Sequence, residues 1–442
     1  MFINSFLTLP CFLLPMKLNF KYIFLFLLIL TTGYAKAEKA DTLSISAADS
    51  LTIKSDSLMI AYLAGQGIPV TKDNDLKLLK SGHEKFENLF ADIRKAKHYI
   101  HLEYFNFRND SIANALFELL AVKAKEGVKI RALFDAFGNW SNSRPLRKEH
   151  LKVIRQKGIE IYHFDPIRFP YLNHIMHRDH RKIVVIDGIV SYTGGMNIAD
   201  YYINGLPEIG TWRDMHLRIE GSATKFLQEI FLTMWNKTTK QDIGGEEYFP
   251  LLSDSLLLAG NKAVAIVDRA PRKTPKQIRH AFIQTIRSAQ EKIQIVNPYF
   301  LPTHSIKKEL KRALKRGIDV EVMISTKADI PFTPDATFYY AHKLMKKGAR
   351  IYMYNGGFHH SKTMMVDDTY CTVGSANLNS RSLRYDYEVN AFIFDKEITD
   401  ELTDLFQEDK EHCTELTPEV WKKRSGWKKF VGWFAHLFTP VL

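Results

Sequence analysis

The sequence is organised around one stretch, Met176-His-Arg-Asp-His-Arg-Lys-Ile-Val-Val-Ile-Asp-Gly188. It holds a histidine and a lysine two positions apart, His180 and Lys182, and then Asp187. The apolar residues between Lys182 and Asp187 are typical of a buried strand. Residues i and i+2 of a strand share a face, so we expect His180 and Lys182 to point the same way.

The pattern returns once, as His360-Ser-Lys-Thr-Met-Met-Val-Asp367, which includes Lys362 and begins 180 residues after His180. Each copy is followed by small residues and an asparagine, in Gly194-Gly-Met-Asn197 and in Gly374-Ser-Ala-Asn377. One His-x-Lys-x4-Asp pattern is weak evidence of function. Two copies with the same downstream residues indicate a functional pair.

The chain around the first motif alternates between predicted helices and strands. We expect helices at His83–Lys97, Ser111–Glu126 and Arg147–Lys157, and strands at Tyr99–Phe107, Val128–Phe134 and Ile159–Phe164. The second half repeats this order: Ile293–Phe300 resembles Ile100–Phe107, and Lys315–Ile318 resembles Lys125–Val128. The sequence therefore predicts an α/β fold built by internal duplication.

This pattern divides the chain into six parts. We expect a signal peptide or membrane anchor at 1–37, a polar linker at 38–75, a first copy at 76–245, a second linker at 246–261, a second copy at 262–412 and a basic amphipathic tail at 413–442.

Composition limits the partners. The formal net charge of +12 favours a polyanion, either nucleic acid or an anionic lipid surface. The three cysteines have no CxxC or finger spacing, so neither a disulfide framework nor a structural zinc site is indicated. Nothing in the sequence indicates the oligomeric state.

The N-terminus has the features of a secretory signal. Lys17 and Lys21 precede the apolar run Tyr22–Leu30, and Ala35-Lys-Ala37 resembles a cleavage site. An uncleaved anchor is the alternative, and Met16 is an alternative start. A signal or an anchor would send the body of the chain across or onto a membrane, and of the two sides of the bacterial cell membrane we expect the exported one.

The C-terminal tail is basic and aromatic. Its apolar residues Trp427, Phe430 and Phe434 fall on one helical face, and lysines cluster nearby. This arrangement favours a helix at an anionic membrane interface. Docking of the helix on its own domain is the alternative.

The paired motifs suit phosphoryl chemistry. An imidazole nitrogen can attack phosphorus while a neighbouring lysine neutralises charge on the phosphate oxygens. The amides of Asn197 and Asn377 could donate to the phosphate, and Asp214 and Glu388 are candidate acceptors that orient the imidazoles.

Asp187 and Asp367 complete the two motifs, so we include them among the candidate catalytic residues with His180, Lys182, His360 and Lys362. Their place at predicted turns favours structural or indirect roles.

These motifs resemble the phospholipase D superfamily, and the chain from about Leu76 onward resembles bacterial cardiolipin synthases. The stretches that carry this resemblance include Ile100–Tyr104, His180–Gly188, Thr193–Ile198, Trp212–Asp214, Asn297–Phe300, Val373–Leu378, Ser380–Ser382 and the basic Trp-rich tail. Such synthases usually carry two N-terminal membrane spans, whereas this chain has one short signal-like run.

The resemblance implies two phospholipase D-like domains, each a mixed β-sheet flanked by helices, with one active site at their interface. It implies that one histidine forms a phosphohistidine and that the other protonates the leaving alcohol, without a metal or another cofactor. By analogy, His180 is the nucleophile and His360 the acid/base. The expected substrate is phosphatidylglycerol, which would be converted to cardiolipin and glycerol.

Two other functions stay open. A phosphodiesterase of the same superfamily could hydrolyse phospholipid or, against the indications of export and of the tail, nucleic acid. A membrane-binding protein without activity is the third reading, and the two intact motifs argue against it. We expect phosphatidylglycerol and an anionic membrane surface as partners, and no nucleic acid.

Overall fold

The computed structural model describes residues 54–166, 176–251, 260–330 and 333–438. The expected signal peptide or anchor at 1–37 lies outside the described residues. Within the described ranges, no helix combines the length and the apolar character needed to cross a membrane.

The first half alternates strands and helices within a few residues of the predicted bounds. Its elements are β1 (Thr71–Leu79), α3 (Gly82–Lys95), β2 (Tyr99–Tyr104), α4 (Ser111–Lys125), β3 (Lys129–Asp135), α5 (Ala136–Ser141), α6 (Lys148–Gln156), β4 (Ile159–Phe164), β5 (Ile183–Ile186), β6 (Val190–Gly194), α7 (Tyr201–Asn204), β7 (Trp212–Arg213), β8 (His216–Gly221) and α8 (Thr224–Thr239).

The second half repeats the order after a short 3-10 turn, η3 (Glu246–Tyr248). Its elements are β9 (Lys262–Arg269), α10 (Gln277–Ser288), β10 (Lys292–Val296), α11 (His304–Lys315), β11 (Asp319–Ser325), α12 (Thr333–Met345), β12 (Arg350–Tyr354), β13 (Phe358–His359), β14 (Thr363–Val366), β15 (Tyr370–Gly374), α13 (Ser380–Arg384), β16 (Glu388–Phe394) and α14 (Lys396–Lys410). The chain continues into β17 (Cys413–Glu415), α15 (Pro418–Lys423), α16 (Gly426–Ala435) and η4 (His436–Phe438).

The strands of both halves join in one mixed sheet of 15 strands. The first half contributes the order β1-β8-β6-β5-β2-β3-β4, and the second half contributes the matching order β9-β16-β15-β14-β10-β11-β12, with β17 at its edge. β1 and β9 pair antiparallel, through Thr71 with Val264 and Asn74 with Lys262. The matching orders confirm the α/β duplication, and the β1–β9 pair makes the two expected sheets continuous.

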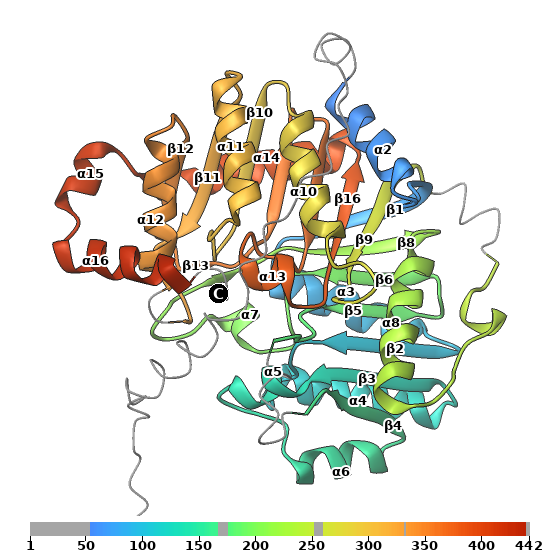
Figure 1. Cartoon of the computed structure of the whole chain (residues 1–442). Coiled ribbons are helices and arrows are strands. Elements are labelled where there is room, and N and C mark those ends of the chain that lie inside the picture. The colour runs from blue at the N-terminus through green and yellow to red at the C-terminus, as the bar shows by residue number, and fades with distance from the viewer. Residues whose placement is uncertain (1–53, 167–175, 252–259, 331–332, 439–442) are drawn as a thin grey trace, which may run out of the picture. The chain divides into compact units, whose positions relative to one another are not determined.

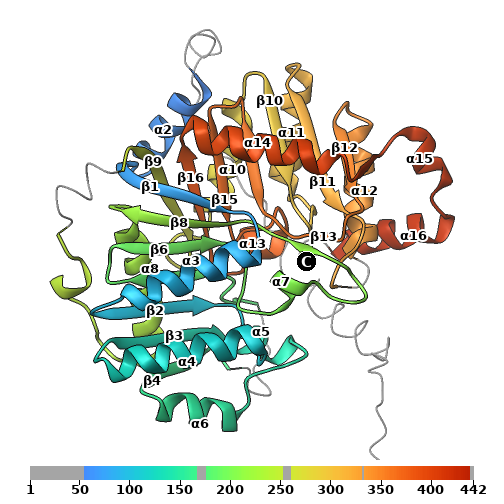
Figure 2. The same ribbon diagram turned by 180° about the vertical axis from the view of Figure 1, so that it is seen from behind.

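Helices cover both faces of the sheet. Figure 1 shows α8, α10 and α11 in front of the strands, and the reverse view in Figure 2 brings α3, α4 and α14 forward. In each half the first three strands after the amphipathic helix run parallel, as β2-β3-β4 and β10-β11-β12. Strands covered on both faces are buried along their length, and every residue of β2 is buried, including the polar His101 and Glu103.

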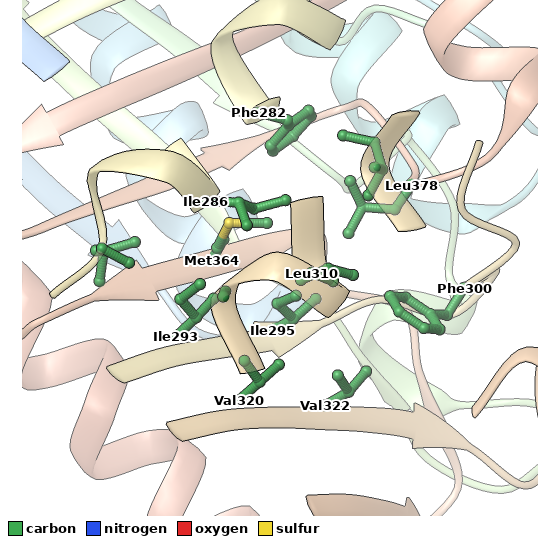
Figure 3. Close-up of a cluster of buried hydrophobic side chains, with 14 of the residues drawn as sticks. Phe282, Ile286, Ile293, Ile295, Phe300, Leu310, Val320, Val322, Met364 and Leu378 are labelled. Atoms are coloured by element: carbon green, nitrogen blue, oxygen red, sulfur yellow. The ribbon is translucent and has the colours of Figure 1, made fainter. Parts of the chain in front are cut away.

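The core of the second half shows how the sequence builds this layer (Figure 3). Ile293 and Ile295 of β10 lie beside Val320 and Val322 of β11, and all four side chains are buried. Apolar residues from α10 and α11, among them Ile286 and Leu310, pack over them. Spacing of two in the strands and about 3.6 in the helices places these side chains in the same layer.

The predicted linker at 38–75 is wrong over its second part. Residues Ser55–Gly65 form helix α2, and its Met59 and Leu63 are fully buried in the core of the second half, where α2 contacts α10. The strand β1 then begins at Thr71. The polar sequence of β1 did not indicate a strand. Its buried Asn74 is tolerated because the side chain donates to Thr71 O and Lys262 O and accepts from the amide of Ala223.

Two smaller boundaries also shift. Within the second expected linker, Tyr248 is buried and its carbonyl accepts a hydrogen bond of 2.8 Å from the Tyr99 hydroxyl. At the other end, β17 pairs antiparallel with β12, so the first residues of the expected tail belong to the sheet. Both segments are held by partners distant in sequence, which local composition does not reveal.

Candidate active site

The two motifs lie just before equivalent strands. His180 and Lys182 precede β5, and His360 and Lys362 precede β14, so the expected strands begin one residue after each lysine. Each extended segment is fixed by the opposite half. The amide of His360 donates to Arg213 O at 2.7 Å, and the amide of His180 donates to Tyr387 O at 3.0 Å.

The residues next to those carbonyls supply the side-chain acceptors. Nδ1 of His180 lies 3.0 Å from a carboxylate oxygen of Glu388, and Nδ1 of His360 lies 2.6 Å from one of Asp214. Each histidine is therefore oriented by a carboxylate from the opposite half. An ionised carboxylate only accepts hydrogen bonds, so the neutral imidazole donates from Nδ1 and keeps its lone pair on Nε2.

Both carboxylates favour the ionised form. Burial alone would raise the pKa of Asp214, but Lys362 and His360 together hold it below its usual value. Burial likewise opposes ionisation of Glu388, and His180 with Lys182 lowers the pKa of Glu388 below its usual value. These are the conditions in which the tautomer of each histidine is fixed.

The pKa values of the cationic groups are also lowered, which disfavours their charged forms. Burial, helped by the charge of Lys362, lowers the pKa of His360 to about 4, although Asp214 opposes it. Burial also lowers the pKa of Lys182 to about 7, against the charge of Glu388. The pKa of Lys362 falls for the same reason. An anion bound here would raise all three pKa values, so the site favours a phosphate.

The lysines lie against their histidines. The ammonium of Lys182 donates to His180 O at 2.5 Å, and that of Lys362 lies 3.0 Å from Nδ1 and 3.2 Å from Nε2 of the His360 ring. Both lysine side chains are buried. The structure thus brings both histidines, both lysines and both acceptors together as the sequence predicts.

Asn197 and Asn377 occupy equivalent loops after β6 and β15. Both are buried, and the side-chain oxygen of each has no hydrogen-bond partner. The oxygen and nitrogen of an amide side chain can exchange places, so each residue offers one unpaired polar group. A buried polar group without a partner is costly, and a bound phosphate could supply that partner.

The small residues before these asparagines have a specific role. A Cβ added to Gly195 would lie 2.1 Å from a carboxylate oxygen of Asp214. Ser375, its counterpart, donates its hydroxyl to Glu388 at 2.5 Å. Small size at these positions therefore lets the loops approach the two acceptors.

The aspartates of the motifs lie elsewhere, which corrects their inclusion among the candidate catalytic residues. Asp187 accepts hydrogen bonds from the backbone amides of residues 97–99, and Asp367 accepts them from those of residues 290–292. The four residues of β5 separate Asp187 from Lys182, so the two positions are five residues, or roughly 16 Å, apart along a strand. Both carboxylates fix the start of the neighbouring strands β2 and β10.

Two further groups support the site and escaped the sequence analysis. Asp135, at the end of β3, binds the Arg178 guanidinium at 3.0 Å and the Asp179 amide at 2.8 Å. Its position at the carboxyl end of a predicted parallel strand could have indicated a functional residue. Lys85 of α3 donates to the carbonyls of Met196 and Asn197. Nothing in the surrounding sequence distinguishes Lys85 from other lysines on amphipathic helices.

Across the residues that the structure describes, no group of three or more His, Cys, Asp or Glu side chains is arranged to hold a metal ion. Nδ1 of each paired histidine faces a carboxylate from the opposite half.

Comparisons with known proteins identify the family of the chain. The family model described as "Cardiolipin synthase, PLD-like domain" matches residues 89–235 and 282–410, one segment in each half. A cardiolipin synthase of Listeria welshimeri is 39% identical over 89% of this chain and 81% of its own length. Cardiolipin synthase 2 of Staphylococcus epidermidis is 39% identical over 84% of this chain and 75% of its own length.

A solved structure shares the fold. The phosphatidylserine synthase of Haemophilus influenzae aligns with a TM-score of 0.64 and 15% identity, over 86% of this chain and 99% of that chain. The family model covers most of the chain, and the relatives exceed 30% identity over most of their length. The chain therefore belongs to the cardiolipin synthase family of phospholipase D-like phosphatidyltransferases.

Proposed function

We propose that this protein is a cardiolipin synthase that transfers the phosphatidyl group of one phosphatidylglycerol to a second, releasing glycerol. One observation carries the proposal. Two histidines lie beside lysines, and each is held at Nδ1 by a carboxylate from the opposite half. This arrangement leaves two Nε2 atoms for the substrate, one to attack phosphorus and one to move a proton.

In the first step, Nε2 of His180 attacks the phosphorus and the bond from phosphorus to the glycerol oxygen breaks. His360 gives its proton to that oxygen, and glycerol leaves. Lys182 and Lys362 neutralise charge on the phosphate oxygens. In the second step, a hydroxyl of the acceptor lipid attacks phosphorus, its proton passes to His360, and the P–N bond breaks.

The low pKa of His360 is compatible with these two reaction steps if the bound substrate raises that pKa. In the empty site that pKa is about 4, mainly because the ring is buried. A phosphodiester brings a negative charge beside the ring and raises the pKa. We therefore expect His360 to take up its proton as the lipid binds.

Contact with an anionic membrane is part of the proposal, and α16 supports it. One side of α16 packs on α12, where a Cβ on Gly432 would lie 2.3 Å from Asp335 O. On the other side, Trp427 is 71% exposed and Phe430 and Trp433 are about half exposed. The helix is thus docked on its own domain and still presents aromatic side chains, with Lys428 and Lys429 beside them to attract anionic lipid.

An N-terminal signal or anchor would place the enzyme on the exported side of the bacterial cell membrane. The aromatic surface of α16 would then contact the membrane on that side. Hydrolysis of phospholipid is the second candidate, because the His180 side chain is 17% exposed and could meet water as well as lipid.

The test uses purified protein and phosphatidylglycerol vesicles, with products identified by mass spectrometry. Cardiolipin and glycerol are the expected products. Phosphatidic acid alone would assign hydrolysis, and no turnover would remove both lipid reactions. His180→Ala and His360→Ala should each abolish turnover with an unchanged melting temperature, while the exposed His83→Ala control stays active.

A further inference from the structure

The two halves differ in what surrounds their histidines. Beside His180 lies the ring of Phe105, with centroids 5.2 Å apart. Beside His360 lies Tyr299, with ring centroids 6.1 Å apart. In the duplicated strands Tyr299 corresponds to Asn106, so the phenol belongs to the second half alone. A near-symmetric site therefore carries a phenol on one side, where the other side has an amide.

Tyr299 is tied to a carboxylate. Its side chain is buried, and its hydroxyl donates to Asp329, which lies in the loop after β11 and is exposed. Burial, together with this carboxylate, raises the pKa of Tyr299 well above its usual value, so the phenol stays a donor. This hydrogen bond uses one carboxylate oxygen of Asp329, and the second oxygen can accept a hydrogen bond from another donor.

The loop that carries Asp329 is held at the junction of the two halves. The ammonium of Lys327 donates to Ile209 O at 2.8 Å, and Ala328 packs against the apolar core of the first half. Asp329 lies close enough to His360 and Lys362 for its charge to oppose the lowering of both pKa values. The carboxylate is thus positioned beside the site rather than on a free loop.

A fixed carboxylate repels a phosphate and is a poor neighbour for the charged part of an anionic lipid. It is a good acceptor for hydroxyl groups. Glycerol supplies these on both sides of the proposed reaction, because the leaving group is glycerol and the acceptor attacks through its glycerol head group. Both alcohols exchange their proton with the same histidine, so both occupy the same side of the phosphorus.

We propose that Asp329, held in place by Tyr299, binds the non-reacting hydroxyls of the glycerol head group beside His360. This inference rests on the proposed function and deepens it. It makes Asp329 a specificity-determining residue, Tyr299 a positioning residue, and the second half the alcohol side of the site.

The test lets two alcohols compete for the phosphatidyl-enzyme. Phosphatidylglycerol vesicles are incubated with deuterated glycerol and 1-propanol, and deuterated phosphatidylglycerol, phosphatidylpropanol and cardiolipin are measured. 1-Propanol has a reacting hydroxyl and no second one. We expect Asp329→Ala to lower the ratio of deuterated phosphatidylglycerol to phosphatidylpropanol about tenfold, as loss of a hydrogen bond to a charged group predicts. Tyr299→Phe should lower it less.

Formation of phosphatidylpropanol reports the chemistry itself and should persist in both variants. Glu149→Ala, which removes an exposed carboxylate on α6, is the matched control and should keep the wild-type ratio. An unchanged ratio in Asp329→Ala, or an equal loss of both products, would overturn the inference and leave the synthase intact. A wild-type enzyme that transfers to no alcohol would overturn the proposed function as well.

Discussion

At the scale of single residues, the crossed histidine–carboxylate pairs make each half depend on the other. Asp214 and Glu388 are buried and ionised, and each fixes the tautomer of a histidine more than 100 residues away. A neutral amide in their place can still bond to the ring, but it neither demands a proton on Nδ1 nor stabilises an imidazolium. The two carboxylates should therefore matter for rate more than for folding.

We expect Asp214→Asn and Glu388→Gln each to lower kcat with phosphatidylglycerol by about 10²- to 10⁴-fold, the range seen when a histidine loses its orienting carboxylate. Asp409→Asn is the matched control, because Asp409 forms a similar buried pair with His359 at 2.9 Å outside the two motifs. A kcat loss in the control as large as in the two variants would contradict a special role for the crossed pairs.

Gly195 gives a steric test of the same geometry. An alanine Cβ there would lie 2.1 Å from the carboxylate of Asp214, so Asp214 must move away from His360. We expect Gly195→Ala to lower kcat at least tenfold. Gly244→Ala adds the same methyl group where nothing lies within 4 Å, and it should behave as wild type. Wild-type kcat in Gly195→Ala would show that the acceptor tolerates displacement.

Sequence alone could predict the paired histidines, lysines and asparagines because duplication repeats them at matched positions. It could also name Asp214 and Glu388 as acceptors. It could not predict that they cross between halves, since the contact depends on segments that pair through backbone atoms. The two aspartates of the motifs were included because they complete a conspicuous pattern, although their place at turns already favoured structural roles.

At the scale of elements, α2 shows the limit of local composition. Its helix follows a polar stretch, yet Leu63 is fully buried in the core of the second half. We expect Leu63→Ala to lower the free energy of unfolding by about 2–5 kcal/mol. Ser57→Ala, on the exposed side of α2, should change it little. Equal stabilities of the two variants in thermal or denaturant unfolding would mean that α2 does not pack as described.

The aromatic face of α16 makes a prediction about membrane binding. Removing Trp427 and Phe430 together should weaken partition onto phosphatidylglycerol vesicles at least tenfold, because each large apolar side chain contributes about 1.5–3 kcal/mol when buried. Trp140→Ala on α5 is the matched control, since Trp140 is also 71% exposed. A vesicle sedimentation assay that gives equal loss for both proteins would show that α16 is no special anchor.

At the scale of the whole molecule, the periodicity of the elements predicted the α/β duplication correctly. The continuity of the 15-stranded sheet was not predictable, because the β1–β9 pair joins backbone groups of two strands whose sequences carry no matching pattern. That pair closes one edge of each half and leaves the two motifs to meet across the junction. Stability and activity should accordingly respond together to changes in the shared core.

The buried histidines predict how the stability of the whole fold depends on pH. His101 is stacked between Tyr99 and Phe231, with ring centroids 4.7 and 4.3 Å away, and its Nδ1 lies 3.1 Å from Gln228. Burial, with a smaller contribution from Arg131, lowers the pKa of His101 to about 3. In the unfolded chain a histidine has a pKa near 6.5.

Between pH 6.5 and 3 the unfolded chain therefore binds a proton at His101 that the folded protein does not. The contribution to stability is complete above pH 6.5 and is lost as pH falls toward 3, at up to about 1.4 kcal/mol per pH unit. We expect His101→Gln to be less stable at neutral pH, but to lose stability less steeply in acid. Exposed His83→Gln should keep the wild-type slope. Denaturant unfolding measured from pH 7 to pH 4 tests this, and parallel curves for wild type and His101→Gln would show that His101 is protonated equally in both states.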